Sequence, residues 1–184
     1  MFLFSFFETA MTIFWAILQL ALIILIVPLT LYGFIIGAPI FFSPKKGIGE
    51  ILAECHVKPG EKFYDLGAGN GRAMILAAKK FNLDVYGFEL SPLLVLIAKL
   101  NLLLCGVKKS TIYLKNLYNE DLSNADIIFC FLTPKAMERL RPKFEKELRP
   151  GTRIISYAFP LKDWQPKKII RNGYPGNMYL YEKS

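Results

Sequence analysis

The sequence predicts an α/β fold: a Rossmann-like sheet that ends in an antiparallel hairpin, preceded by one N-terminal transmembrane helix. Three observations support this prediction. After residue 57, short apolar strand-like segments alternate with helical segments, which is typical of a parallel sheet covered by helices on both faces. A glycine-rich loop, GAGNG at 67–71, follows the first strand. The first 44 residues are dominated by Ile, Leu, Phe and Val and carry one charge, Glu8.

The N-terminal segment is long enough to cross a bilayer. Its 36 residues from 9 to 44 carry no charge, whereas one span needs about 20 apolar residues and two spans with a turn need roughly 40. We therefore expect one helix, with Pro28 as a kink that lipid-embedded helices tolerate. A cleaved signal peptide fits poorly, because no Lys or Arg precedes the apolar run and the run is too long. A buried core helix would need a larger protein around it.

The charges beside this segment predict its orientation. Lys45 and Lys46 follow it, and Glu8 is the only charge before it, so the positive-inside rule places residues 45–184 in the cytoplasm. We expect a single-pass membrane protein in which residues 1–44 form the membrane anchor and linker. Residues 45–184 then form one globular domain, and the lipid bilayer is its first expected partner.

The order of elements after the linker follows from hydrophobic patterns and turn residues. Ser91-Pro92 is a typical helix start, and NGYPG at 172–176 indicates a hairpin between the last two strands. Helices are expected at 49–55, 73–78, 92–104 and 134–148, and strands at 63–66, 85–89, 111–114, 126–132, 152–159, 168–171 and 177–181.

The glycines of the loop favour contact between backbone and ligand. Glycine permits a positive φ and leaves room for close approach, and the helix that follows offers free backbone N–H groups to an anionic group. A dinucleotide-binding loop needs glycine at its first, third and sixth positions. Here Gly67 and Gly69 fit, but the sixth position is Arg72, so NAD fits poorly. The alternative is a glycine-rich turn without a ligand.

Two acids flank this loop and suggest which nucleotide it binds. Asp65 lies two residues before Gly67, and Glu89 ends the next strand, 24 positions after Asp65, where an acid accepts the two hydroxyls of a ribose. This order resembles the nucleotide loop of the seven-strand methyltransferases that use S-adenosylmethionine. The resemblance implies that cofactor, with contacts from Asp65, Gly67, Gly69, Gly71 and Glu89. Asn116, after the third strand, is a candidate adenine contact or a turn residue.

Further motifs carry a closer resemblance over nearly the whole chain. They are PIFFSP at 39–44, VKPG at 57–60, GFEL at 87–90, LRPGT at 148–152 and DW at 163–164. Together they resemble the membrane-anchored protein-lysine methyltransferases whose animal members modify the mitochondrial adenine nucleotide carrier and the ATP synthase c subunit. The resemblance implies a class I methyltransferase sheet and a lysine acceptor in or near a membrane. Two positions depart from the family: Asn70 stands where it has an acid, and Tyr157 where it has a polar residue or histidine.

Methyl transfer is an in-line displacement, so the enzyme mainly holds nucleophile and methyl group close together. A lysine acceptor must also lose a proton, and an apolar channel that desolvates the ammonium lowers its pKa. Thr133, Tyr157 and Trp164 follow or end the fourth and fifth strands. We name these three as candidate catalytic residues; the two aromatic rings would also attract a cation. The alternative for each is ordinary core packing.

Other partners are judged from charge and cysteine use. Residues 45–184 hold 23 basic and 14 acidic residues, but the cations are dispersed, and FLTP at 131–134 lacks the Asn/Asp-Pro-Pro-aromatic motif of base-amino methyltransferases. We therefore expect no nucleic acid partner. The three cysteines have no CxxC spacing and His56 has no ligand neighbour, so neither metal nor disulfide is expected. Two alternatives to a lysine acceptor stay open: a lipid or quinone-like small molecule, or a non-catalytic cofactor-binding membrane protein.

Overall fold

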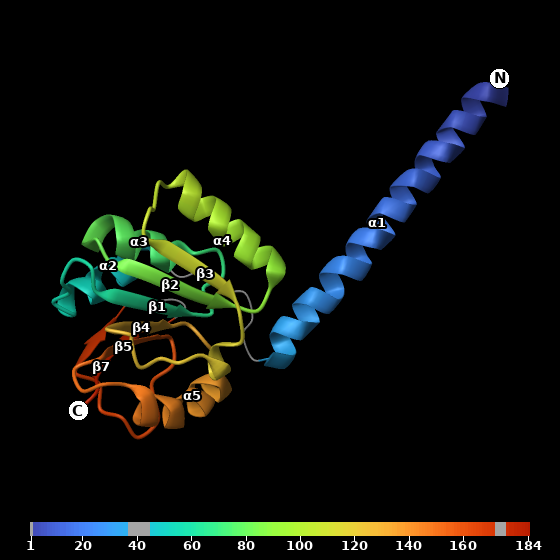
Figure 1. Ribbon diagram of the computed structural model, residues 1–184. Helices are drawn as coiled ribbons and strands as arrows, with labels where there is room; N and C mark the ends of the chain where they lie inside the picture. The colour runs from blue at the N-terminus through green and yellow to red at the C-terminus, as the bar shows by residue number, and fades with distance from the viewer. Residues whose placement is uncertain (1, 37–44, 172–175) are drawn as a thin grey trace. The chain divides into compact units, whose positions relative to one another are not determined.

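A computed structural model describes residues 2–36, 45–171 and 176–184 and divides the chain into two compact units, Met1–Ile36 and Gly37–Ser184 (Figure 1). The first unit is helix α1 (Phe2–Ile36), with Pro28 inside it. Its stretch Phe7–Pro28 spans 22 residues and has a mean hydropathy of 2.6, and its side chains are exposed among the described residues. By length and composition it can cross a membrane. The linker residues that follow α1, 37–44, lie outside the described residues.

The second unit is built on a seven-stranded sheet in the order β3-β2-β1-β4-β5-β7-β6 (Figure 1). β7 is antiparallel to its neighbours β5 and β6, and the other pairings are parallel. This confirms the predicted α/β sheet with a C-terminal antiparallel hairpin. The strands are β1 (Lys62–Leu66), β2 (Asp84–Glu89), β3 (Ser110–Leu114), β4 (Ile127–Cys130), β5 (Arg153–Tyr157), β6 (Lys168–Ile170) and β7 (Met178–Glu182).

Four further α-helices and one 3₁₀ turn connect these strands. They are α2 (Lys45–Glu54), α3 (Arg72–Phe81), α4 (Pro92–Leu104), η1 (Leu117–Asn119) and α5 (Pro134–Glu147). α2 begins four residues before the expected start. Ile48, Ile51 and Leu52 are fully buried at helical spacing, so one apolar face continues through the glycines of this segment.

The core has two parts, one on each face of the sheet. Successive residues of β5 alternate between them: Ile154 packs in the cluster that includes Leu140 of α5, and Ile155 in the cluster that includes Met74 of α3. β4 is buried at all four positions, as a central parallel strand should be. It is shorter than expected because its partner β1 ends at Leu66, opposite Cys130.

Candidate active site

The candidate site lies where the strand order reverses, between β1 and β4. In an open α/β sheet, ligands bind beyond the carboxyl ends of the strands at this reversal. Leu66, at the end of β1, pairs with Phe88 of β2 and with Cys130 of β4. The sheet therefore brings the glycine loop, the end of β2 and the segment after β4 to one edge.

The loop has the backbone that the glycine spacing predicted. Gly67, Gly69 and Gly71 have φ values of 87°, 55° and 77°, which side chains other than glycine adopt rarely. A Cβ on Gly67 would lie 3.0 Å from the Leu132 side chain, whereas a Cβ on Gly69 would meet, among the described residues beyond its chain neighbours, a loop carbonyl at 4.0 Å. Gly71 caps α3 without a side-chain hydrogen bond. The loop thus leaves space at Gly69 for close approach of a cofactor.

Glu89 ties the loop to the start of α4. Its carboxylate accepts the Gly69 N–H at 3.0 Å, and also the backbone N–H groups of Leu90 at 2.8 Å and Ser91 at 2.9 Å. Asn101 of α4 donates from Nδ2 to the Asn70 carbonyl at 3.0 Å. Asn101 was not among the residues expected from the sequence; its signal there was one amide in a helix that otherwise holds apolar residues and Lys99.

Asp65 is a buried carboxyl beside the loop. Its side chain is only 2% exposed, and burial, followed by the nearby charge of Glu89, raises its pKa to about 8. Cys130 on the neighbouring strand is also buried, and its thiol pKa is raised well above the usual value, first by burial and then by Asp65. Asp65 is therefore protonated at neutral pH unless a cation joins it.

The two aromatic candidates lie in different parts of the core. Tyr157 is fully buried at the end of β5, with its ring centroid 4.4 Å from that of Phe131. Trp164 instead packs edge-on against Tyr181 in the cluster that contains α5. The structure does not join Tyr157 and Trp164 into one ring pair. Within the described part of the chain, the Tyr157 hydroxyl is buried without a hydrogen-bond partner, and such groups are rare in folded proteins.

Thr133 and Asn116 lie at the predicted sheet edge, and each caps a helix. Thr133 Oγ1 accepts the Ala136 N–H at 3.4 Å at the start of α5, and Asn116 Oδ1 accepts the Tyr118 N–H at 3.1 Å at the start of η1. These caps give both side chains a structural role. Contact with substrate or adenine stays a prediction.

The segment before Trp164 is held by an ion pair that was not expected from the sequence. Arg141 of α5 donates to the Asp163 carboxylate at 2.7 Å, and Asp163 has a φ of 63°. The Leu161 N–H donates to the Tyr181 hydroxyl at 2.9 Å. In the sequence, the signal for this turn was Asp163 itself, since Asp tolerates a positive φ better than most residues.

The sheet order, the glycine loop and the acid at the end of β2 define an S-adenosylmethionine-dependent methyltransferase. A solved RNA methyltransferase from Salinibacter ruber, in complex with S-adenosyl-L-homocysteine, has the same fold, with a TM-score of 0.73 and 29% identity over 77% of this chain and 93% of that one. The chain belongs to the ANTKMT methyltransferase family, whose domain model matches residues 65–168.

Two curated relatives support this membership. A protein-lysine N-methyltransferase of Saccharolobus islandicus is 37% identical over 76% of this chain and 89% of its own length. The adenine nucleotide translocase lysine N-methyltransferase of Mus musculus is 34% identical over 73% of this chain. The match spans 59% of that mouse protein.

Proposed function

We propose that this protein is a membrane-anchored methyltransferase that modifies a lysine side chain of a membrane or membrane-proximal protein. Residues 1–44 are the anchor and linker, and residues 45–184 are the catalytic domain on the cytoplasmic side. Two findings support the proposal: relatives named as protein-lysine methyltransferases and a helix that is long and apolar enough to span a bilayer.

The cofactor side of the site consists of the loop and its two acids. When bound, S-adenosylmethionine supplies an electrophilic methyl group on a sulfonium sulfur. Gly67, Gly69 and Gly71 would let the backbone approach it closely, and the Glu89 carboxylate, which binds the Gly69 N–H, would accept the ribose hydroxyls. Asp65 would lie toward the cationic part of the cofactor, and Asn116 would contact the adenine.

The acceptor side uses groups beyond β4 and β5. A lysine amine has an ordinary pKa of about 10.4 and must lose a proton before it attacks. Tyr157 and Phe131 offer an apolar wall that disfavours the ammonium form, and the unpaired Tyr157 hydroxyl hydrogen-bonds the incoming nitrogen. Thr133, at the start of α5, borders this edge of the sheet; Trp164 packs on Tyr181, and we propose that Thr133 and Trp164 position the substrate chain.

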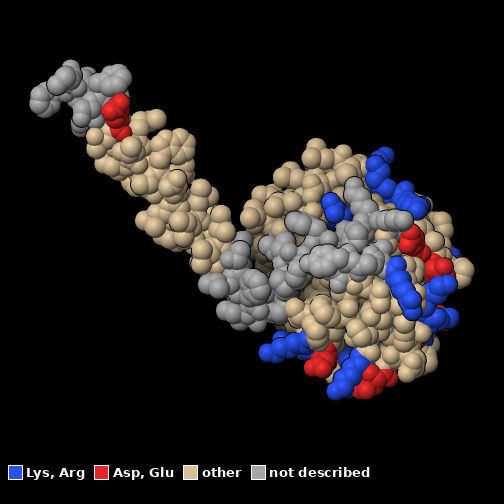
Figure 2. All heavy atoms as spheres, turned by 180° about the vertical axis from the view of Figure 1, so that it is seen from behind, with Lys and Arg blue, Asp and Glu red and all other residues tan. Residues whose placement is uncertain are grey.

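A membrane protein is the acceptor class that best fits the anchor. The mouse relative is named for its action on the adenine nucleotide translocase, and an anchored enzyme meets membrane proteins first. An RNA acceptor is the competing class, because the Salinibacter ruber neighbour is an RNA methyltransferase. On the face that Figure 2 displays, Lys and Arg side chains lie dispersed among Asp and Glu, without one continuous basic patch for a nucleic acid backbone.

The test transfers radioactive methyl groups from the cofactor into membranes of a strain that lacks this protein. The full chain is added as wild type, as Gly67→Arg, and as Gly60→Arg. Gly60 is the matched control because its φ of 83° is close to the 87° of Gly67, yet no atom of the described residues, its chain neighbours aside, lies within 4 Å of its Cβ position. We expect a labelled protein band, retained with Gly60→Arg and lost with Gly67→Arg. Circular dichroism verifies that both variants are folded.

The destination of the label separates the classes of acceptor. Label on a lysine of a membrane protein supports the proposal. Label in an organic extract shows a lipid or quinone-like acceptor, and label in RNA shows a nucleic acid acceptor; either overturns it. Calorimetric binding of S-adenosylmethionine without transfer to any fraction would show a non-catalytic cofactor-binding protein and would also overturn it.

A further inference from the structure

α4 carries an apolar face that the folded domain does not cover. Outside α1, the described residues include seven large hydrophobic side chains that are exposed, and five of them belong to α4. A sixth, Leu114, ends the neighbouring strand β3. We call the five residues the α4 leucine face: Leu93, Leu96, Leu100, Leu103 and Leu104.

These leucines form one stripe. At 100° per residue they lie on the side of α4 opposite Val95, Ala98 and Leu102, which are buried against the sheet. The exposure is high, reaching 73% for Leu103 and 83% for Leu104. Contiguous apolar surface of this kind marks an interaction site. The helix has 13 residues, too few to cross a bilayer and enough to lie on one.

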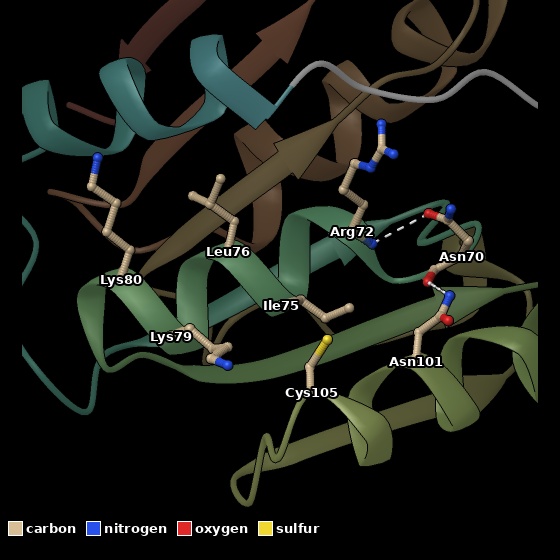
Figure 3. A pocket seen from close by; sticks show the side chains of 8 residues that line it. All are labelled: Asn70, Arg72, Ile75, Leu76, Lys79, Lys80, Asn101 and Cys105. Carbon is tan, nitrogen blue, oxygen red and sulfur yellow. Dashed lines mark hydrogen bonds between the residues drawn. The ribbon is translucent and has the colours of Figure 1, made fainter.

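Basic side chains border this stripe on both flanks. Lys99 lies on one flank by helical spacing. On the other flank, Asn101 and Cys105 face α3 across a pocket of about 460 Å³ that is also lined by Arg72, Lys79 and Lys80 (Figure 3). Lys108 follows the carboxyl end of the helix, Lys109 beside it pairs with Asp84 at 3.3 Å, and α4 itself contains no acid. Leucines framed by cations are the pattern of helices that lie in the interface of an anionic bilayer.

We propose that the α4 leucine face docks on the surface of an anionic lipid bilayer, with the surrounding lysines at the level of the headgroups. This inference rests on the membrane anchor of the proposed function. Residues 37–44 join Ile36 to Lys45, and the nine Cα–Cα steps between those two residues reach at most about 32 Å, so the tethered domain stays close to lipid. α4 begins three residues after Glu89, and docking therefore holds the cofactor edge of the sheet near the membrane.

The test measures contact with lipid in the full-length protein. The chain is reconstituted in vesicles of equal parts phosphatidylcholine and phosphatidylglycerol, with and without bromine on the acyl chains, which quenches tryptophan on contact. In a Trp15→Phe parent, one variant carries Leu100→Trp. The matched control carries Ile169→Trp, because Ile169 is also exposed, at 47%, but lies on β6 at the opposite edge of the sheet.

We expect bromolipid to reduce the fluorescence added by Leu100→Trp by about half or more, as for a ring in the acyl boundary, and to leave that of Ile169→Trp unchanged. Pure phosphatidylcholine should weaken the effect, because the lysines lose their anionic partners. Equal fluorescence of Leu100→Trp in both lipids overturns the proposal and points to a protein partner for this face. Trp15 in the unaltered chain reports the anchor separately: if Trp15 is quenched and Leu100→Trp is not, only the docking inference fails.

Discussion

At the residue scale, burying the Tyr157 hydroxyl without a hydrogen bond lowers the stability of the folded protein, and a contact with the acceptor explains why the hydroxyl is present. It is buried without a partner among the described residues, and burial raises its pKa, so it stays protonated at neutral pH, and its oxygen accepts an N–H of the incoming amine and leaves the nitrogen lone pair free to attack. We predict that Tyr157→Phe lowers kcat about tenfold or more while the melting temperature stays equal or rises, since the lost hydroxyl makes no hydrogen bond to the described residues of the free enzyme. Turnover and thermal melts of the same samples check this.

Tyr181→Phe is the matched control for this prediction. The Tyr181 ring is also buried, but its hydroxyl accepts the Leu161 N–H at 2.9 Å, so its removal leaves a buried donor unpaired. We expect a loss of about 1–3 kcal/mol in unfolding free energy and a smaller effect on kcat. If Tyr157→Phe retains full turnover, the hydroxyl has no role in catalysis.

Asp65 gives a prediction about pH. Its folded pKa of about 8 lies above the ordinary value of 3.8, so the folded state holds the proton more tightly than the unfolded chain does. The stability that this proton contributes is fully present below about pH 4 and is lost as the pH rises toward 8. We predict that Asp65→Asn melts at a higher temperature than the wild type at pH 8, and that the gap shrinks toward pH 5. Melting curves across this range check it.

The control for Asp65→Asn is Asp121→Asn. Asp121 is exposed, and hydrogen bonds from Ser123 lower its pKa. Its contribution is therefore present above the ordinary pKa and is lost in acid, outside the pH 5–8 window. A gap for Asp65→Asn that stays constant from pH 5 to pH 8 would show that the carboxyl does not titrate in this range.

Sequence reasoning located the residues whose role depends on the local backbone conformation. Gly67, Gly69 and Gly71 were identified because a tight loop needs positive φ whatever surrounds it, and all three have it. Asn101 and the Arg141–Asp163 pair were missed because their partners lie 31 and 22 positions away. Hydrogen bonds between distant segments depend on how the elements pack, and the periodicity of hydrophobic residues along the sequence does not predict them.

At the element scale, α4 and α5 begin with the same kind of N-terminal cap. Substituting each cap therefore distinguishes an effect on stability from an effect on catalysis. α4 begins Ser91-Pro92 and α5 begins Thr133-Pro134, and each cap oxygen accepts the backbone N–H three residues on at 3.4 Å. We predict that Ser91→Ala and Thr133→Ala each lower the unfolding free energy by about 1 kcal/mol. Only Thr133→Ala should also lower turnover, because Thr133 borders the acceptor side. Equal activity of the two variants would leave Thr133 as a cap alone.

Element boundaries were predictable where a local signal marks them. The Ser-Pro start fixed α4 at residues 92–104, as the structure has it. The segment 126–132 was expected to be strand throughout, but β4 covers only Ile127–Cys130. Phe131 and Leu132 are apolar because they pack in the core, not because they pair. Buried residues and residues that pair in a strand are both apolar, so the sequence does not distinguish them. The end of the strand is decided by where its neighbouring strand stops pairing.

At the scale of the whole molecule, the chain joins a unit suited to lipid with a unit that has its own core. The sheet of the second unit was predictable from the alternation of strands and helices, including the hairpin that closes it. The α4 leucine face was not predictable. A helix with one apolar face on the sheet and a second apolar face outside the domain has the same composition as a fully buried helix. Its exposure is visible only once the domain is assembled.

The orientation in the membrane is the prediction that involves the whole chain. Lys45 and Lys46 adjoin the anchor, and Glu8 lies at its other end; positive residues within about 15–20 positions of a span set its direction. We predict that a C-terminal tag is digested by added protease in inverted vesicles and protected in intact spheroplasts. The triple variant Glu8→Lys, Lys45→Glu and Lys46→Glu should reverse this pattern in a large fraction of molecules.

The matched control is Lys79→Glu with Lys80→Glu, which changes the same number of lysines more than 30 positions after the anchor, beyond the range of the rule. Its tag should keep the orientation of the wild type. A reversed molecule places the domain away from the cytoplasm, where the cofactor is made, so methylation of the membrane acceptor should fall in proportion to the reversed fraction. A wild-type tag that is protected in inverted vesicles would contradict the orientation, and a chain that alkaline carbonate strips from membranes would contradict the anchor itself.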